Sequence, residues 1–144
     1  AEDDPDDRLL TRRALSESHV ATMLTTVENG EELLRYLRQE DRSRKETAEE
    51  RGRPDLILLD LNMPRMDGRE ALREIKSDPE LRRIPVVVLT TSEADRDILE
   101  SYNLGVNAFM TKPVTFDALA DAMDSLGAFW FDLVKLPPEH DANE

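Results

Sequence analysis

Cysteine is absent from the 144-residue chain, and histidine occurs only at positions 19 and 140. Without cysteine there can be no disulfide, thiolate metal site or cysteine nucleophile. Two histidines are too few for a multi-histidine metal site, and they make a Ser-His-Asp triad a poor interpretation. No apolar run approaches the roughly 20 residues that span a membrane, and no signal-peptide pattern opens the chain. We therefore expect a cytoplasmic protein with no membrane partner.

Basic residues are also in short supply, because 19 Lys and Arg face 32 Asp and Glu, which gives a formal net charge of -13. A surface of this sign disfavours unaided binding to nucleic acid or to anionic membranes, since both require a cationic partner. The length predicts one domain with a real core. We place this domain in residues 1–127 and treat residues 128–144 as a C-terminal helix extension and tail.

The stretch from 53 to 68 holds the most informative carboxylate. An apolar run over residues 55–59 is typical of a strand buried on both faces of a parallel sheet, and it ends at Asp60, before a turn containing Asn62 and Pro64. At this position Asp60 would lie in the crevice where open α/β sheets bind ligands. The alternative is that Asp60 only accepts hydrogen bonds from the turn.

Short strands alternate with helices along the rest of the chain. Strands are predicted over 21–27, 55–59, 85–90 and 108–111, with helices beginning at Pro5, after Asn29, near Asp67, at Asp95 and at Thr115. This alternation predicts a parallel sheet with helices on both faces. Asp4 suits the N-cap of the first helix, and Asp6 and Asp7 suit its first turn. The charged stretch 39–53 is interpreted as a solvated surface.

The acidic opening of the chain is typical of the exit from a strand. We expect that apolar residues precede Ala1 in the full protein and form a further, central strand. The carboxyl ends of parallel strands lie along one edge of a sheet. That edge would gather five polar residues: Glu2, Asp3, Asp60, Thr90 and Lys112.

This set of side chains suits phosphoryl chemistry. Clustered carboxylates raise one another's pKa unless a cation joins them, and oxygen ligands without His or Cys suit Mg²⁺. A hydroxyl and an ammonium beside such a site can hold the oxygens of a phosphoryl group. The predicted reaction is transfer of a phosphoryl group onto Asp60 as nucleophile.

Taken together, the motifs resemble the receiver domain of two-component response regulators over nearly the whole chain. The resemblance rests on the Glu2-Asp3 pair, the block from Asp60 through Asn62-Met63-Pro64 to Asp67-Gly68, the strand over 86–90, and Lys112-Pro113. It implies a flavodoxin-like, doubly wound, five-stranded α/β sheet in the order 2-1-3-4-5, with the first strand missing from this sequence.

The resemblance also implies a role for each site residue. Asp60 resembles the phosphoacceptor, and Thr90 and Lys112 resemble the switch hydroxyl and the phosphate-contacting lysine. The implied Mg²⁺ ligands are Glu2, Asp3, Asp60 and the backbone carbonyl of Asn62. Phe109 lies where many receivers place a switch aromatic, although a plain core aromatic is an equal alternative. The Lys112–Pro113 peptide bond is expected to be cis, as in the family.

The implied partner is a sensor histidine kinase, whose phosphohistidine is the donor. The protein is then a stand-alone phosphoacceptor that catalyses its own phosphoryl transfer and autodephosphorylation, and it signals by a change of conformation and interface. The charged insert after Gln39 and the ending FWFDLVKLPPE resemble small receivers paired with bacterial phytochrome kinases. The sensor kinase would then be a bacteriophytochrome.

The C-terminal aromatic residues predict an interface. The last helix has too few neighbours in the domain to cover Phe129, Trp130 and Phe131, and an exposed aromatic patch typically marks a contact surface. We expect a homodimer through Phe129, Trp130 and Leu133. The alternative is that the tail folds back as a cap on its own core.

Two other functions compete with the signalling one. Haloacid-dehalogenase-type phosphatases also use an Asp nucleophile at a strand end with Mg²⁺, Thr or Ser, and Lys. They need a second Asp two residues after the nucleophile, where this chain has Asn62. A receiver that serves only as a phosphate sink or a docking module would carry the same motifs.

Overall fold

The computed structural model describes residues 1–17, 23–38 and 53–133, with side chains up to residue 130. Three parallel strands form the described sheet in the order β1-β2-β3. They are β1 (Ile57–Leu59), β2 (Val86–Thr90) and β3 (Ala108–Thr111). Every residue of β2 is buried, which is the burial that its β-branched sequence predicts for a central strand.

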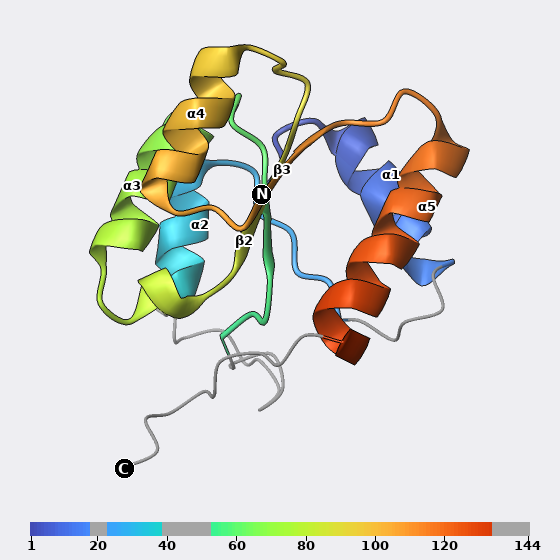
Figure 1. Cartoon of the computed structure of the whole chain (residues 1–144), viewed down its shortest axis with the longest axis horizontal. Coiled ribbons are helices and arrows are strands. Elements are labelled where there is room, and N and C mark those ends of the chain that lie inside the picture. The colour runs from blue at the N-terminus through green and yellow to red at the C-terminus, as the bar shows by residue number, and fades with distance from the viewer. Residues whose placement is uncertain (18–22, 39–52, 134–144) are drawn as a thin grey trace.

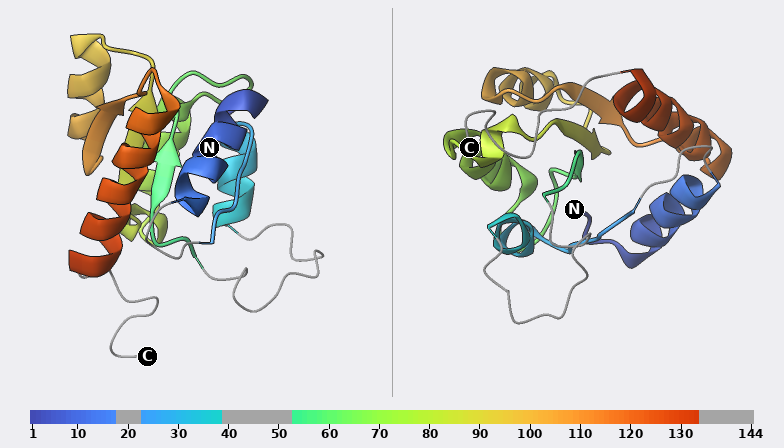
Figure 2. Two further views of the ribbon diagram at one scale, coloured as in Figure 1. Left: turned by 90° about the vertical axis from the view of Figure 1, so that its right-hand side faces the viewer. Right: turned by 90° about the horizontal axis from the view of Figure 1, so that it is seen from below.

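Helices cover both faces of this sheet (Figure 1). α1 packs against α5 on one side, while α2 packs against α3, and α3 against α4, on the other. The two groups also lie on opposite sides of the strands in the view from below, on the right of Figure 2. The helices and helical turns are α1 (Pro5–Ser16), α2 (Gly30–Leu37), α3 (Gly68–Ser77), η1 (Leu81–Arg83), α4 (Asp95–Leu104), α5 (Phe116–Gly127) and the π-helix η2 (Ala128–Leu133).

Polar caps set the helix starts that the sequence predicts. The side chains of Asp4, Asn29, Asp67 and Thr115 each accept a backbone N–H of the following first turn. Such a cap stabilises a helix by about 1 kcal/mol. Because each cap is a local interaction, the starts of α1, α2, α3 and α5 follow from the sequence alone.

The core is divided by the sheet into two clusters. Val86 and Val88 of β2 face a cluster that also contains Leu59 and Ile75. Leu89 faces the other, with Ala14 of α1 and Leu119 and Met123 of α5 as further members. Successive strand residues point to opposite faces, so one short strand serves both clusters. The parallel, two-faced α/β architecture predicted above is confirmed.

The strand predicted over residues 21–27 is not formed by the described residues 23–27. In this segment the Val27 carbonyl accepts the Glu2 N–H at 3.0 Å. On the other side, the Ala1 nitrogen donates to the Leu58 carbonyl at 2.8 Å, and the Asp60 N–H donates to the Ala1 carbonyl at 3.1 Å. Ala1 and Glu2 thus lie between the segment and β1, where the central strand was expected. The described sheet has three strands, in the order β1-β2-β3, instead of the expected five.

The predicted cis bond before Pro113 is also wrong, because none of the described peptide bonds is cis. The Lys112 N–H donates to the Thr90 carbonyl at 2.8 Å with the following bond trans. Trans is the isomer that is favoured before proline, by about 0.5–1 kcal/mol.

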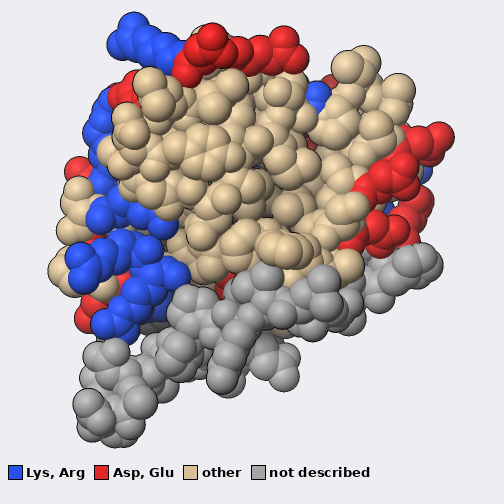
Figure 3. Space-filling model, in the orientation of Figure 1, with Lys and Arg blue, Asp and Glu red and all other residues tan. Residues whose placement is uncertain are grey.

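Charge is unevenly spread over the described surface. In the view of Figure 3, acidic and basic side chains gather toward the margins, and uncharged residues cover the middle of the face. Among the described helices, none combines the length and the apolar character needed to cross a membrane.

Candidate functional site

Asp60 follows β1 directly and is only 6% exposed. The turn behind it is closed by the Gly68 N–H, which donates to the Leu61 carbonyl at 2.9 Å. A Cβ at Gly68 would lie 2.1 Å from the Asp60 carbonyl oxygen. Glycine is therefore required where α3 begins, because the helix start lies against the backbone that carries the carboxylate.

Donors from three successive parts of the chain converge on the Asp60 carboxylate. Thr90 Oγ1, at the end of β2, donates to Oδ1 at 2.8 Å. Lys112 Nζ, directly after β3, donates to Oδ2 at 3.2 Å. The turn itself contributes only the Asn62 N–H, at 3.3 Å from Oδ1. The two shorter contacts come from other strand ends, so Asp60 is more than an acceptor for its own turn.

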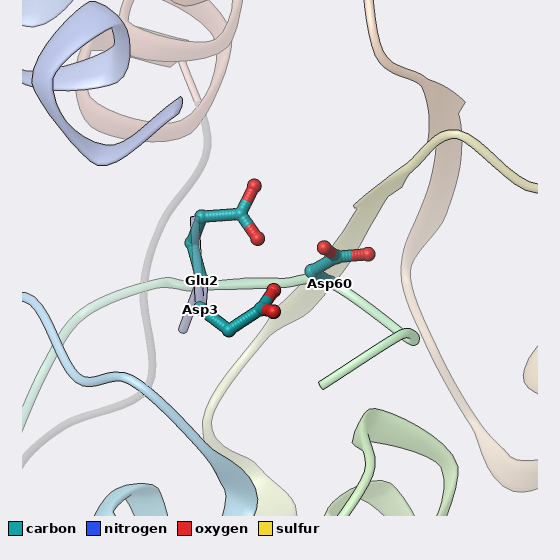
Figure 4. Close-up of side chains that lie close together, drawn as sticks. All are labelled: Glu2, Asp3 and Asp60. Atoms are coloured by element: carbon teal, nitrogen blue, oxygen red, sulfur yellow. The ribbon is translucent and has the colours of Figure 1, made fainter. Parts of the chain in front are cut away.

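Three carboxylates lie together at this edge (Figure 4). Glu2, Asp3 and Asp60 each place one oxygen within 4.8 Å of the others. Glu2 Oε2 is buried and has no hydrogen-bond partner within the described parts of the chain. A buried polar atom without a partner is rare in proteins. An all-oxygen set with one such atom fits a hard divalent cation.

Glu2 and Asp60 ionise differently. Burial raises the pKa of Glu2 to about 8, and the neighbouring Asp60 adds to this rise. Burial alone would raise the pKa of Asp60 too, but interactions with Glu2, Thr90 and Lys112 outweigh it and hold that pKa below its usual range. At neutral pH without a metal ion, Asp60 is therefore the ionised member of the pair.

Lys112 is paired with three carboxylates: Glu2, Asp7 at 2.9 Å and Asp60 at 3.2 Å. Burial opposes its charge, but hydrogen bonds to Glu2 and Asp7 outweigh the burial and hold its pKa above the ordinary value. The ammonium therefore stays charged at neutral pH.

Asp7 is the site residue that the sequence argument missed, because the first turn of a helix already explains a carboxylate there. Its position was the available signal. Asp7 lies in the first turn of α1, and helical side chains lean back toward the N-terminus, which here is preceded by Glu2 and Asp3.

The burial of the aromatic residues differs from the prediction. Phe109 pairs in register with Val88 and packs against the core cluster, which fits the core alternative. Trp130 is only 9% exposed, so its assignment to an exposed patch was wrong, whereas Phe129 is 52% exposed. Adjacent residues of a helix point in different directions and do not share one face. The side chain of Leu133 lies outside the described residues.

Comparison with known proteins identifies the family. The response regulator receiver domain matches residues 1–124. Response regulator Rcp1 of Synechocystis sp. is 40% identical over 136 residues, which cover 94% of this chain and 89% of that protein. The chain belongs to the response regulator receiver domain family.

Solved structures agree with this assignment. The phosphorylated cyanobacterial phytochrome response regulator RcpA is 45% identical, with a TM-score of 0.85 over 96% of this chain and 95% of that chain. The Mn²⁺-bound form of response regulator Rcp1 is 40% identical, with a TM-score of 0.83 over 96% of each chain. The flavodoxin-like receiver fold is thereby confirmed.

The family membership settles the class of function. The protein is a phosphoacceptor of two-component signalling, phosphorylated by a sensor kinase, and the haloacid-dehalogenase alternative is no longer needed. Receiver domains bind a divalent metal ion, and the carboxylates of this chain are suited to hold one.

Proposed function

We propose that Asp60 is the phosphoacceptor and that Thr90 and Lys112 act on the phosphoryl group it receives. One observation carries this proposal: a hydroxyl and an ammonium from different strand ends contact different oxygens of one ionised carboxylate, at 2.8 and 3.2 Å. Both donors are thus already beside the place where a phosphoryl group would be attached. Their placement lowers the reorganisation needed during transfer.

The reaction is a displacement at phosphorus. A carboxylate oxygen of Asp60 attacks the phosphohistidine of a sensor histidine kinase, the P–N bond breaks, and the imidazole leaves and takes up a proton. The Thr90 hydroxyl then donates to a phosphoryl oxygen, and Lys112 offsets part of the added charge. Mg²⁺, when held by Glu2, Asp3, Asp60 and the backbone carbonyl of Asn62, would neutralise further charge on the group.

The signal leaves through Thr90. Its hydroxyl holds Asp60 in the unmodified protein, and a move toward the phosphoryl group would displace the loop that leads from β2 into α4. The equilibrium between two arrangements of α4, β3 and α5 would shift accordingly. Phe109 on β3 would follow this change as a switch aromatic.

The kinase is proposed to be a bacteriophytochrome. Support comes from the similarity to RcpA, whose structure is that of a phytochrome response regulator. A phosphotransfer assay with phosphorylated bacteriophytochrome tests this proposal, and partner binding measured before and after the transfer separates a signalling receiver from the phosphate-sink alternative. A signalling receiver changes its partner binding after phosphorylation, while a sink only loses the phosphoryl group.

We also propose a homodimer through the C-terminal helix, with Phe129 and Leu133 in the contact. Its support is the exposure of Phe129, whose ring packs edge-on against Trp130 at 5.5 Å between centroids. The buried Trp130 would support the ring of Phe129 in the dimer contact. Folding back of the tail remains the competing arrangement.

Incubation with Mg²⁺ and acetyl phosphate, followed by intact-mass spectrometry, tests the role of Asp60. Wild type should gain one labile phosphoryl group, and Asp60→Asn should gain none. Asp55→Asn is the matched control, because this exposed Asp precedes the same strand, and it should behave like wild type. A labile adduct of equal extent on Asp60→Asn would contradict the proposal.

A further inference from the structure

Asp7 differs from the other two carboxylates on Lys112. The Lys112 ammonium has three N–H donors, and Glu2, Asp7 and Asp60 provide three acceptors. Glu2 and Asp60 also belong to the cluster of carboxylate oxygens within 4.8 Å, whereas Asp7 does not. Asp7 is therefore bound to the lysine but is separate from the cluster that is suited to a cation.

The three partners also have different fates in the reaction. Asp60 loses its carboxylate charge when it becomes an acyl phosphate, and Glu2 is one of the groups suited to hold the metal ion. Asp7 is the one whose chemistry stays the same throughout. Lysine has a flexible four-carbon stem with many rotamers. A constant partner would keep Nζ beside the acceptor while the other two change.

The fold holds Asp7 at the right place for this role. It lies in the first turn of α1, where its own N–H donates to Asp4 Oδ1 at 3.3 Å. α1 packs against α5, and Lys112 precedes α5 in the chain. The contact at 2.9 Å therefore ties the end of β3 to the start of α1 across 105 residues of sequence.

We propose that Asp7 is a positioning residue that holds the Lys112 ammonium toward Asp60 during phosphoryl transfer. Asp7 acts through Lys112 and does not itself contact the phosphoryl group. The inference rests on the proposed role of Asp60 as acceptor. The competing explanation is that the negative charge of Asp7 only stabilises α1, by interacting favourably with the helix dipole at its N-terminus.

Asp6 provides a matched control for that explanation. It is an exposed carboxylate in the same helical turn, so Asp6→Asn removes the same charge from the helix start. Initial rates of adduct formation with acetyl phosphate are compared at saturating Mg²⁺ for wild type, Asp7→Asn and Asp6→Asn. The two Asn variants are also made in a Lys112→Ala background, and slow reactions are followed for hours by mass spectrometry.

Asp7→Asn should lower the initial rate about fivefold, because the lysine is less well oriented. Asp6→Asn should change it by less than about twofold, as should Asp7→Asn in the Lys112→Ala background, where there is no lysine to position. In metal-free protein, Asp7→Asn and Lys112→Ala together should lower the urea midpoint by less than the sum of their separate effects.

Three outcomes overturn the proposal. They are an unchanged or faster rate for Asp7→Asn, an equal loss in Asp6→Asn, and an undiminished effect of Asp7→Asn without Lys112. Failure of the proposed function gives a different result, namely no labile adduct on wild type or an adduct that survives Asp60→Asn. The urea measurement tests the Asp7–Lys112 contact even then.

Discussion

Single residues decide how the Asp60 carboxylate is presented. Thr90 is fully buried and uses its hydroxyl on Asp60, so a strand that is otherwise apolar ends in one oriented donor. Glu2 carries the raised pKa and Asp60 the lowered one. Both carboxylates are partly buried, but burial dominates at Glu2, whereas interactions with Glu2, Thr90 and Lys112 outweigh burial at Asp60, so the two carboxylates ionise differently.

Gly68 is the residue whose replacement should damage both fold and function. In Gly68→Ala, the new Cβ would meet the Asp60 carbonyl oxygen at 2.1 Å and the Leu61 Cα at 2.7 Å. Both are backbone atoms that move only with the turn. We expect a loss of about 3 kcal/mol in the free energy of unfolding, measured by urea denaturation, together with slower phosphorylation of Asp60.

Gly105→Ala serves as the comparison for that variant. Gly105 has φ of 106° at the end of α4, and a Cβ there meets nothing closer than Lys76 Cδ at 3.6 Å. The left-handed backbone should cost Ala about 1–2 kcal/mol without slowing phosphorylation. Equal phosphorylation rates for the two variants would show that the turn at Gly68 does not position Asp60.

At the scale of elements, an ion pair between Arg69 and Asp97, called the clasp below, joins α3 to α4. Arg69 of α3 donates to both carboxylate oxygens of Asp97 of α4, at 2.9 and 2.8 Å. The Ser92 hydroxyl, in the loop after β2, donates to the same carboxylate at 2.6 Å. Ser92 lies two residues after Thr90 in the chain. The clasp therefore lies beside the segment that is proposed to move on phosphorylation.

The clasp predicts a pH-dependent stability. Hydrogen bonds from Arg69 and Ser92 lower the pKa of Asp97 from 3.8 to about 2. A carboxylate with a lowered pKa in the folded state stabilises that state above pH 3.8, and this contribution is lost as the pH falls toward 2. At pH 7, Asp97→Asn should therefore lower the free energy of unfolding by about 1–2 kcal/mol.

The measurement is urea denaturation of wild type and Asp97→Asn at a series of pH values from 7 to 2. The difference between their free energies of unfolding should shrink as the pH falls below 4. Asp95→Asn is the control, because Asp95 is exposed in the same first turn of α4 and should give little difference at any pH. A difference between wild type and Asp97→Asn that persists at pH 2 would mean that the charge of Asp97 is not the cause.

At the scale of the whole molecule, the aromatic residues after α5 bear on the proposed homodimer. The aromatic pair after α5 separates into a buried Trp130 and an exposed Phe129. The buried Trp130 therefore contributes to the stability of the fold, whereas the exposed Phe129 is available for the proposed dimer contact. Substitutions at the two positions should therefore have different effects.

Phe129→Ala should leave the free energy of unfolding within about 0.5 kcal/mol of wild type but weaken self-association, measured by sedimentation equilibrium. Trp130→Ala should lower the free energy of unfolding by about 3 kcal/mol, because it leaves a cavity. If wild type is monomeric at micromolar concentrations with and without phosphorylation, the dimer proposal is wrong.

Much of the fold and the acceptor site could be predicted from the sequence because the signals are local. Caps such as Asp67 and Thr115 act within one helical turn, and the apolar runs before Asp60 and Thr90 define buried strands. Once the strands are parallel, their carboxyl ends must share an edge. The meeting of Asp60, the Thr90 hydroxyl and Lys112 could therefore be predicted without knowing how the helices pack.

By itself, the sequence determined which polar residues stand at the strand ends and that their edge of the sheet is acidic. Only the tertiary structure decided that Asp7 joins Lys112 and that Arg69 joins Asp97. It also decided that Trp130 is buried and that residues 23–27 form no strand. These outcomes depend on how distant elements are placed against one another. The contacts join residues that are far apart in the sequence, such as Lys112 with Asp7 and Arg69 with Asp97, which no local pattern encodes.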